Sequence, residues 1–352
     1  MNNELSIIIE NNLLTQILFL NVMKKSLILF SVAALALVSC AKVSDKYVGA
    51  PESHEIAFQA ITTPATRAAV DGTTFPNVDM QVAAWDVTNS RDFFTATAFT
   101  KSETTWKGGK YWPLSATYIN FLAYANLTAG SATWDLAGAD KAASGVTLVM
   151  ADNKTTQNDL MYAIGNGEVT QTGNNLAFPA NVPMNFKHAQ AWITFTANAY
   201  DAASGGKVTL NSITLNGAKY NGTFTVTHTN YNASSSQSVA GAWTALGDAQ
   251  NVAVPSWTPA AIAFGDAVSV GAGLMIVPDD NAATADFTSF TLNYTLDGKT
   301  YDYTYIPATA AAANVDQAKH YIYNIVFHLH EIEIAPTVTD WADQSATPVP
   351  IF

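Results

Sequence analysis

The chain has 352 residues, of which 49% are hydrophobic and only 12% are charged, so its composition excludes a largely disordered protein and supplies apolar surface for sizeable cores. A formal net charge of -12 disfavours nucleic acid and anionic lipid surfaces as electrostatic partners. Cys40 is the only cysteine, which excludes a disulfide framework and a metal cluster held by thiolates.

The first predicted element is a secretory signal peptide over residues 23–39. Lys24 and Lys25 precede an apolar run at residues 27–37, which is shorter than the roughly 20 residues that span a bilayer. The sequence Leu-Val-Ser directly before Cys40 resembles the bacterial lipobox, in which the leader is removed and the cysteine thiol carries lipid. We therefore expect Cys40 to be the lipidated, palmitate-bearing first residue of a mature lipoprotein.

Residues 1–22 contain another apolar stretch in front of this signal peptide. A second hydrophobic segment there is redundant for export. We therefore expect translation to begin at Met23, with residues 1–22 as a non-native upstream extension.

The spacer from residue 40 to residue 67 contains one predicted strand, residues 54–60. Successive side chains of a strand point to opposite faces, so this stretch places Ile56, Phe58 and Ala60 together on one face. The spacer is therefore expected to supply a half-buried strand to the fold.

The rest of the chain shows period-two alternation rich in Thr, Val and aromatic residues, which predicts an all-β fold. Asp297 and Gly298 separate two alternating runs and predict a hairpin with a type I′ turn. Residues 126–160 are expected to form loops with one short helix, and residues 230–259 a long excursion. Strands are predicted at residues 80–87, 118–125, 191–197, 208–215, 223–227, 290–296, 299–305, 321–327 and 331–334.

This pattern predicts two tandem β-sandwich domains. We place the first at residues 68–182 and the second at residues 183–352. Amphipathic runs of helical period are absent from the sequence, which argues against helix-rich or parallel-sheet architectures.

Several motifs together resemble the fimbrillins of Bacteroidetes, the subunit family of type V pili. They are Lys-Tyr-Trp-Pro at residues 110–113 with the apolar run at 118–125, Met-x-Phe-x-His at 184–188, and Val-Thr-Asp-Trp at 338–341. The resemblance covers most of residues 40–352. It implies that both sandwiches are transthyretin-like.

The resemblance also implies a mechanism of assembly. A lipidated precursor reaches the outer membrane, and a trypsin-like protease cleaves between Arg67 and Ala68. The released spacer removes the strand that carries Ile56, Phe58 and Ala60. A strand from another pilin subunit then fills the groove, which builds a surface fimbria. Arg67 fits the cleavage position because it is the only lysine or arginine between positions 46 and 91.

The C-terminus is the expected donor. Val349 and Ile351 lie two residues apart and would face the same way. Pro348 and Pro350, however, each lack the backbone N–H that would donate a hydrogen bond to a neighbouring strand. The C-terminal residues therefore cannot pair with an acceptor strand along their full length. The candidate donor residues are Val338, Trp341, Val349 and Ile351.

Other interpretations stand beside this one. The protein could be a non-polymerising outer-membrane lipoprotein, either a fimbrial anchor or a glycan-binding adhesin, that keeps its lipid. Arg67 could be a solvated residue of a flexible spacer. Trp243 and Trp257 could contact glycans or belong to the core.

Enzymatic motifs are not found in the sequence, so we expect no catalytic residue and no cofactor. His328 and His330 share a strand face but lack a third ligand nearby, so we expect no metal site. His188 is expected to pack at the domain junction.

Overall fold

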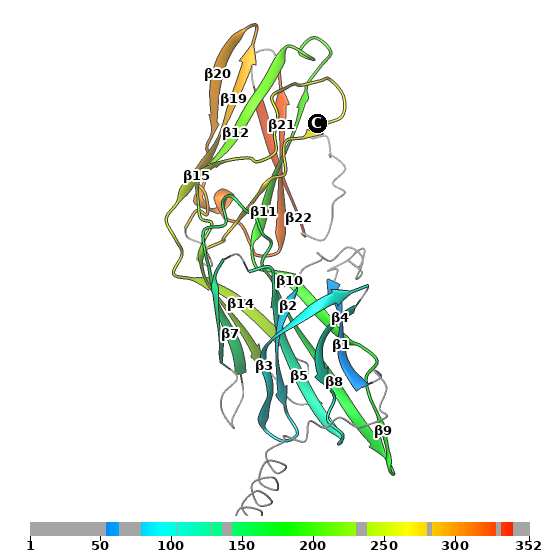
Figure 1. The fold of residues 1–352 in the computed structure, drawn as a ribbon. Helices are drawn as coiled ribbons and strands as arrows, with labels where there is room; N and C mark the ends of the chain where they lie inside the picture. The colour runs from blue at the N-terminus through cyan, green and yellow to red at the C-terminus, as the bar shows by residue number, and fades with distance from the viewer. Residues whose placement is uncertain are drawn as a thin grey trace, which may run out of the picture. The chain divides into compact units, whose positions relative to one another are not determined.

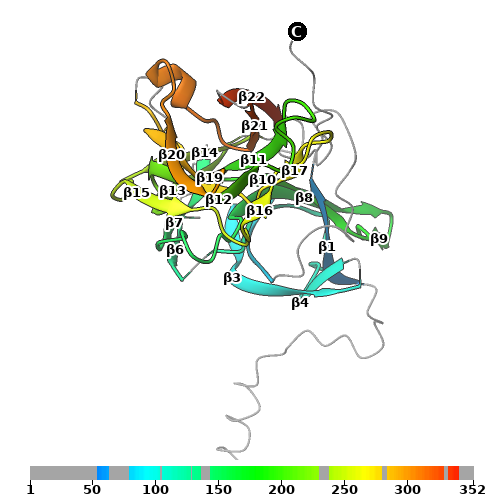
Figure 2. The ribbon, with the colours of Figure 1, turned by 90° about the horizontal axis from the view of Figure 1, so that it is seen from above.

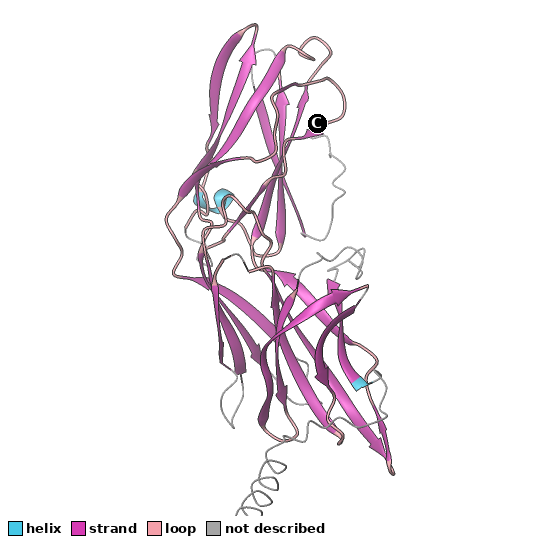
Figure 3. Cartoon of the chain, in the orientation of Figure 1, coloured by secondary structure: helices cyan, strands magenta, loops and turns pink. Residues whose placement is uncertain are grey.

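The computed structural model (Figure 1) describes residues 54–62, 79–103, 105–127, 129–135, 143–229, 238–279, 284–328 and 332–340. This part of the chain is all-β, as predicted, with the short 3₁₀ helix Ala310–Ala313 between strands (Figure 3). No helix within the described ranges is long and apolar enough to cross a bilayer.

The largest sheet has eight strands in the order β10-β1-β4-β3-β2-β5-β8-β9. Strand β10 pairs with β8 as well as with β1, so seven of the strands close into a ring, part of which is visible in Figure 2. The strands of this barrel-like sheet are β1 (Glu55–Thr62), β2 (Met80–Asp86), β3 (Arg91–Ser102), β4 (Thr105–Tyr111), β5 (Thr117–Ala125), β8 (Met161–Thr172), β9 (Asn175–Ala177) and β10 (Val182–His188).

A four-stranded sheet has the order β14-β13-β7-β6. Its strands are β6 (Ser131–Asp135), β7 (Ala143–Met150), β13 (Gly222–Thr229) and β14 (Ser238–Thr244). The expectation of loops and a short helix at residues 126–160 is therefore wrong. Strand β7 pairs with its sequence neighbour β6 and also with β13, which lies far along the sequence and leaves no trace in the local pattern.

Strand β5 shows how the two sheets form layers. Phe121 lies in a core cluster with β1 and β10 residues, whereas the adjacent Leu122 lies in a cluster with Leu148 and Phe224 of the four-stranded sheet. Both faces of β5 are buried, which explains why its sequence is apolar almost throughout.

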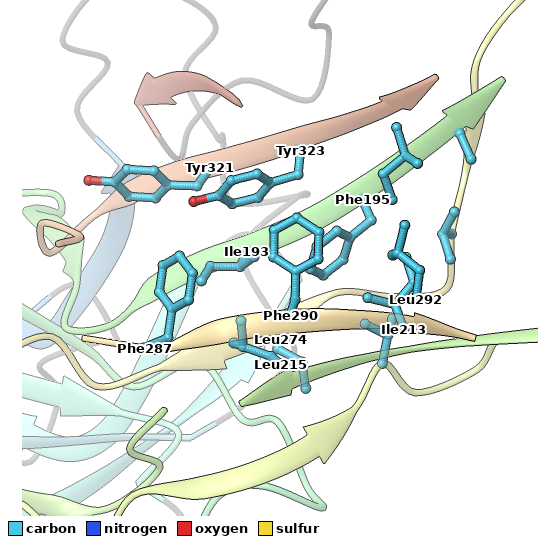
Figure 4. Packing of buried hydrophobic residues seen from close by; sticks show 14 of the residues in the cluster. Ile193, Phe195, Ile213, Leu215, Leu274, Phe287, Phe290, Leu292, Tyr321 and Tyr323 are labelled. Carbon is cyan, nitrogen blue, oxygen red and sulfur yellow. The ribbon is translucent and has the colours of Figure 1, made fainter. Parts of the chain in front are cut away.

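Two five-stranded sheets face each other around a third core. Strand β11 alternates buried and half-buried residues along its whole length, as expected for one covered face. Figure 4 shows Phe195 pointing toward Phe290 of the facing sheet, with ring centroids 5.1 Å apart. The strands are β11 (Ala191–Ala199), β17 (Val268–Ser269), β18 (Leu274–Ile276), β21 (Lys319–Phe327) and β22 (Ile332–Asp340) in one sheet, and β12 (Val208–Ala218), β15 (Gln250–Ala253), β16 (Ala260–Ala261), β19 (Ser289–Leu296) and β20 (Lys299–Tyr305) in the other.

The predicted hairpin is confirmed in β19 and β20. Leu296 lies opposite Lys299, and the two residues between them, Asp297 and Gly298, have φ angles of 49° and 76°. Positive φ at both central positions is what a type I′ turn requires.

Sheet membership does not follow the predicted division between residues 182 and 183. Strand β10 begins at Val182 and lies in the eight-stranded sheet, and residues 222–244 contribute β13 and β14 to the sheet of β6 and β7. The predicted excursion at residues 230–259 likewise contains β14 and β15. Pairing between distant segments decides these memberships, and periodicity alone carries no information about it.

The carboxylate of Asp86, at the end of β2, holds two neighbouring segments together. Its side chain is fully buried and accepts hydrogen bonds from Asn89 Nδ2 and Thr117 Oγ1, both at 2.7 Å, and from Arg91 Nε at 3.2 Å. Burial alone would raise the pKa of Asp86, but these hydrogen bonds outweigh it and hold the pKa below its ordinary value.

We predict that Asp86→Ala lowers the free energy of unfolding by about 1 to 3 kcal/mol, because it leaves the buried hydroxyl of Thr117 without its acceptor. A carboxylate whose pKa is lower in the folded state stabilises the fold at pH values above its unfolded-state pKa. This stability is lost as the pH falls through the folded-state pKa. Asp86→Asn should therefore flatten the acid limb of the stability curve below about pH 4, measured by urea unfolding. Arg91→Gln is the control, because its side chain is 62% exposed and should change stability by less than about 1 kcal/mol. An unchanged acid limb in Asp86→Asn would contradict this account.

Candidate functional site

The candidate site is the place of β1 in the ring. Strand β1 runs antiparallel to β4 and parallel to β10, so that Phe58 lies opposite Trp106 on one side and Val182 on the other. Neither partner strand is adjacent to β1 in the sequence. The strand predicted at residues 54–60 is therefore present, and it links two strands that come much later in the chain.

Apolar side chains of β1 fill the centre of the ring. Ile56 and Phe58 are both 0% exposed. The Phe58 ring meets the rings of Phe99 and Phe121 edge to face, with centroid separations of 4.7 and 5.0 Å. Such geometry adds to the free energy of burying the rings. The predicted shared face of Ile56 and Phe58 is thus a core face, while Gln59 is exposed.

Polar contacts hold the start of β1 against β4. The His54 carbonyl accepts a hydrogen bond from the backbone N–H of Trp112 at 2.9 Å. The Glu55 carboxylate accepts one from the backbone N–H of Gly109 at 3.0 Å. Lys107 Nζ lies 3.7 Å from the same carboxylate, but its side chain is 42% exposed, so that ion pair adds little.

Two adjacent glycines are typical of a turn, but Gly108 and Gly109 both lie within β4. The ladder between β1 and β4 shifts register at this point, and Gly109 has a φ of 65°. A Cβ on Gly108 would lie 2.9 Å from the Phe99 ring. The glycines therefore permit an irregularity in the ladder next to the core.

Strand β1 ends at Thr62, before the proposed processing position. The backbone of Ala60 lies opposite Met184 in β10. Cys40, Arg67 and Ala68 lie outside the described residues, as does the side chain of Ala60.

The candidate donor region begins in β22. This strand pairs antiparallel with β21 and forms one end of its sheet, with Val338 51% exposed. Its last residue, Asp340, forms an ion pair with Lys319. Trp341, Val349 and Ile351 lie outside the described residues.

The two tryptophans considered as glycan contacts, Trp243 and Trp257, both form hydrogen bonds within the protein. Trp243 is buried and donates to the Ala189 carbonyl at 2.6 Å, and the half-buried Trp257 donates to the Leu210 carbonyl at 3.1 Å. Both indole N–H groups are therefore used in contacts within the protein.

The histidine candidates also pack against the protein. His188 Nδ1 lies 2.8 Å from Asp159 Oδ2, and His328 stacks on Tyr200 with centroids 4.1 Å apart. His330 lies outside the described residues. Among the residues described, no group of three or more His, Cys, Asp or Glu side chains is placed to bind a metal ion.

The chain is similar to solved structures of fimbrial proteins. One is a fimbrial protein from Bacteroides vulgatus, with 12% identity, a TM-score of 0.49 and coverage of 82% of this chain and 99% of that one. Others are the fimbrial anchor protein Mfa2 from Porphyromonas gingivalis (10% identity, TM-score 0.34, coverage 82% and 97%) and the C-terminally truncated tip fimbrial protein Mfa3 from the same organism (14%, 0.37, 81% and 100%).

A search of curated proteins gave no match. A family model described as fimbrillin-like matches residues 66–341, which is most of the chain. The match begins one residue before Arg67 and leaves β1 outside it. The protein therefore belongs to the fimbrillin-like family.

Proposed function

We propose that the protein is a structural subunit of type V surface fimbriae, made as a lipoprotein precursor and polymerised by protease-triggered exchange of a strand. One observation carries the proposal: β1 completes the ring with fully buried Ile56 and Phe58, yet lies at the N-terminal side of a predicted cleavage position. Family membership supports an association with other fimbrial subunits.

The sheets are best assigned to two tandem β-sandwich domains of transthyretin-like type. The first contains the ring and the four-stranded sheet, and the second contains the two five-stranded sheets. In this assignment β10 belongs to the first domain, and residues 222–244 cross from the second domain to complete it.

Processing begins with the lipid on Cys40, which holds the precursor at the outer membrane. A trypsin-like protease then cleaves after Arg67, the one lysine or arginine in the stretch between Lys46 and Arg91. The family match starts next to this position, which supports residues 40–67 as a detachable segment. The chain that remains begins at Ala68.

The loss of β1 creates a strong acceptor. Burial of Ile56 and Phe58 contributes about 3 to 6 kcal/mol, at about 1.5 to 3 kcal/mol for each side chain. Departure of the strand would expose this apolar site and the backbone groups of β4 and β10 that face it. Cleavage also ends the covalent link that keeps β1 at high effective concentration. A strand from another subunit can then compete for the site.

The donor is the C-terminal region from β22 onward. Val338 is exposed at the end of its sheet, and the segment beyond Asp340 carries Trp341, Val349 and Ile351. Addition of an extended strand to a sheet joins molecules through main-chain hydrogen bonds, with side chains that fill pockets on alternate positions.

This function requires other pilin subunits, a processing protease and the outer membrane, and it assigns the protein no catalytic activity or cofactor. The alternative, a fimbrial anchor or glycan-binding adhesin that does not polymerise, would keep lipidated Cys40. The N-terminus of the surface form separates the two.

We predict that the surface form begins at Ala68 and that Arg67→Ala prevents both this processing and polymer formation. Arg67→Lys should retain both, because a trypsin-like protease accepts either basic side chain. N-terminal sequencing and denaturing gels of surface fractions measure the two effects. A wild-type surface form that still begins at lipidated Cys40 would favour the anchor or adhesin and reject the polymerising pilin.

We predict that Phe58→Ala destabilises the uncleaved protein by about 3 to 5 kcal/mol, because it leaves a cavity among Phe99, Phe121 and Trp106. The neighbouring Gln59→Ala should change stability by less than about 0.5 kcal/mol, because Gln59 is exposed. Chemical unfolding gives the stabilities. After cleavage at Arg67, the peptide with Phe58→Ala should also leave faster, measured by size-exclusion chromatography. Equal behaviour of the two variants would show that Phe58 does not hold the strand.

We predict that deletion of residues 348–352 abolishes polymer ladders on gels while processing at Arg67 continues. The reason is that the deletion removes Val349 and Ile351 from the donor. A deletion of equal length within residues 230–237 serves as the control for the effect of shortening the chain. Unchanged ladders would exclude the last five residues as donor and move the donor role to residues 331–341 or away from this end of the chain.

A further inference from the structure

One sheet edge, formed by a strand far in sequence from β1, has no partner strand within the described residues. Strand β20 is the last strand of its sheet and pairs only with β19 among the described strands. Six of its seven residues are exposed. Its register with β19 runs without a bulge from Lys299 to Tyr305, and it contains no proline. It is therefore a regular strand with one unpaired side.

The other sheet ends in the described chain are protected. Strand β22 has Pro336 near its centre, which lacks an N–H, and the Gly241 carbonyl of β14 accepts from Gln317 Nε2 at 3.1 Å. The other short strands at sheet margins, β6, β9 and β15 to β18, have five residues or fewer. Short edges, prolines and side-chain cover are the usual defences against strand addition. Strand β20 has none of these three defences. Charged side chains are a further defence, and β20 carries two of them, Lys299 and Asp302.

The turn fixes which backbone groups face outward. In a two-residue hairpin the residues that flank the loop, Leu296 and Lys299, form a hydrogen-bonded pair. Bonding alternates along an antiparallel ladder, so the odd-numbered residues of β20 direct their N–H and C=O groups toward β19. Thr300, Asp302 and Thr304 therefore present theirs to the open side.

The side chains of β20 contact those of β19 on both faces. On the outer face Asp302 accepts from Asn293 Nδ2 at 2.7 Å, and Thr304 lies 3.2 Å from Thr291, hydroxyl to hydroxyl. On the other face the Tyr301 ring stacks on Tyr294, with centroids 5.7 Å apart, while Tyr301 and Tyr303 remain 43% and 36% exposed. Ordering before contact lowers the entropy cost of association.

We propose that this edge pairs antiparallel with β20 of a second copy of the chain, about a twofold axis through Tyr303. In this register Asp302 lies opposite Thr304 of the second copy, so a hydroxyl can donate to each carboxylate. Tyr303 meets its own symmetry mate, and Tyr301 meets Tyr305. A register centred on Asp302 would place two carboxylates directly opposite each other, which is repulsive.

The pairing ends naturally at both sides. Thr300 reaches Ile306 of the second copy, and Pro307 has no N–H with which to extend the ladder. The interface uses no residue of β1, β4 or β10, so it stands whether or not strand exchange occurs. It joins subunits side by side, in an isologous contact that closes at two chains.

Disulfide trapping tests the register in the full chain that carries Cys40→Ser. Tyr303→Cys places two thiols in a non-hydrogen-bonded pair, whose Cα atoms lie about 4.5 Å apart, within disulfide range. Mild oxidation should give mostly covalent dimer. Asp302→Cys is the matched control, because its thiols would lie diagonally, about 7 Å or more apart. Equal yields from the two variants, or no dimer from Tyr303→Cys, would overturn the proposal.

A proline scan tests the hydrogen bonds without added thiols. Thr304→Pro removes an outward N–H but spares the ladder to β19, so the fold should survive with a similar melting temperature. Its self-association, measured by sedimentation equilibrium, should weaken roughly tenfold or more, whereas Thr304→Ala should retain it. Unaltered association of a folded Thr304→Pro variant would overturn the proposal, as would a wild-type chain that stays monomeric at all concentrations tested.

Discussion

The edges of its β-sheets are the constraint on which this protein depends. A strand with a partner on one side only presents unpaired backbone N–H and C=O groups, and such an edge attracts another strand. Here seven strands of the largest sheet close into a ring through the pairs of β10 with β1 and β8, which leaves the three-residue β9 at the margin. The closure needs one strand from the N-terminal spacer, and the core needs that strand's Ile56 and Phe58. Folding of the first half of the chain therefore relies on a segment outside the family match.

The fold also depends on the burial of both faces of β5 and β8. Their alternate residues enter two different cores, for example Phe121 and Ala163 in one and Leu122 and Tyr162 in the other. The four-stranded sheet covers the outer face of these strands, and half of it comes from residues 222–244. Distant parts of the sequence are thus tied to the ring through packing, while the ring itself is closed by backbone pairing.

Alternation of apolar residues and turn residues in the sequence predicted the features that depend on neighbouring residues. The all-β class, the strand near Ile56, and the turn at Asp297 and Gly298 all follow from alternation and turn chemistry, and all are present. The pattern failed where partners are remote: β7 has weak alternation but gains its place from β13, and β10 joins the ring rather than the sheets that follow it. Gly108 and Gly109 have the composition of a turn but lie at a ladder irregularity within β4, because both features favour glycine. For the site, periodicity identified the face of Ile56 and Phe58, but the parallel partner β10 left no local signal.

The topology of β1 suits a removable part. Strands β2, β3 and β4 follow one another through short segments, and each pairs with the next. Strand β1 differs, since its partners β4 and β10 both lie later in the sequence and β2, which follows it, is not among them. Its withdrawal would break no hairpin and would leave the order of every other pair unchanged. The same separation makes β1 dependent on its covalent link, because a detached strand loses the effective concentration that the chain provides. A closing strand with buried anchors and no local partner is therefore stable while it is attached and replaceable once it is cut, and these are the two properties that an exchange of strands requires.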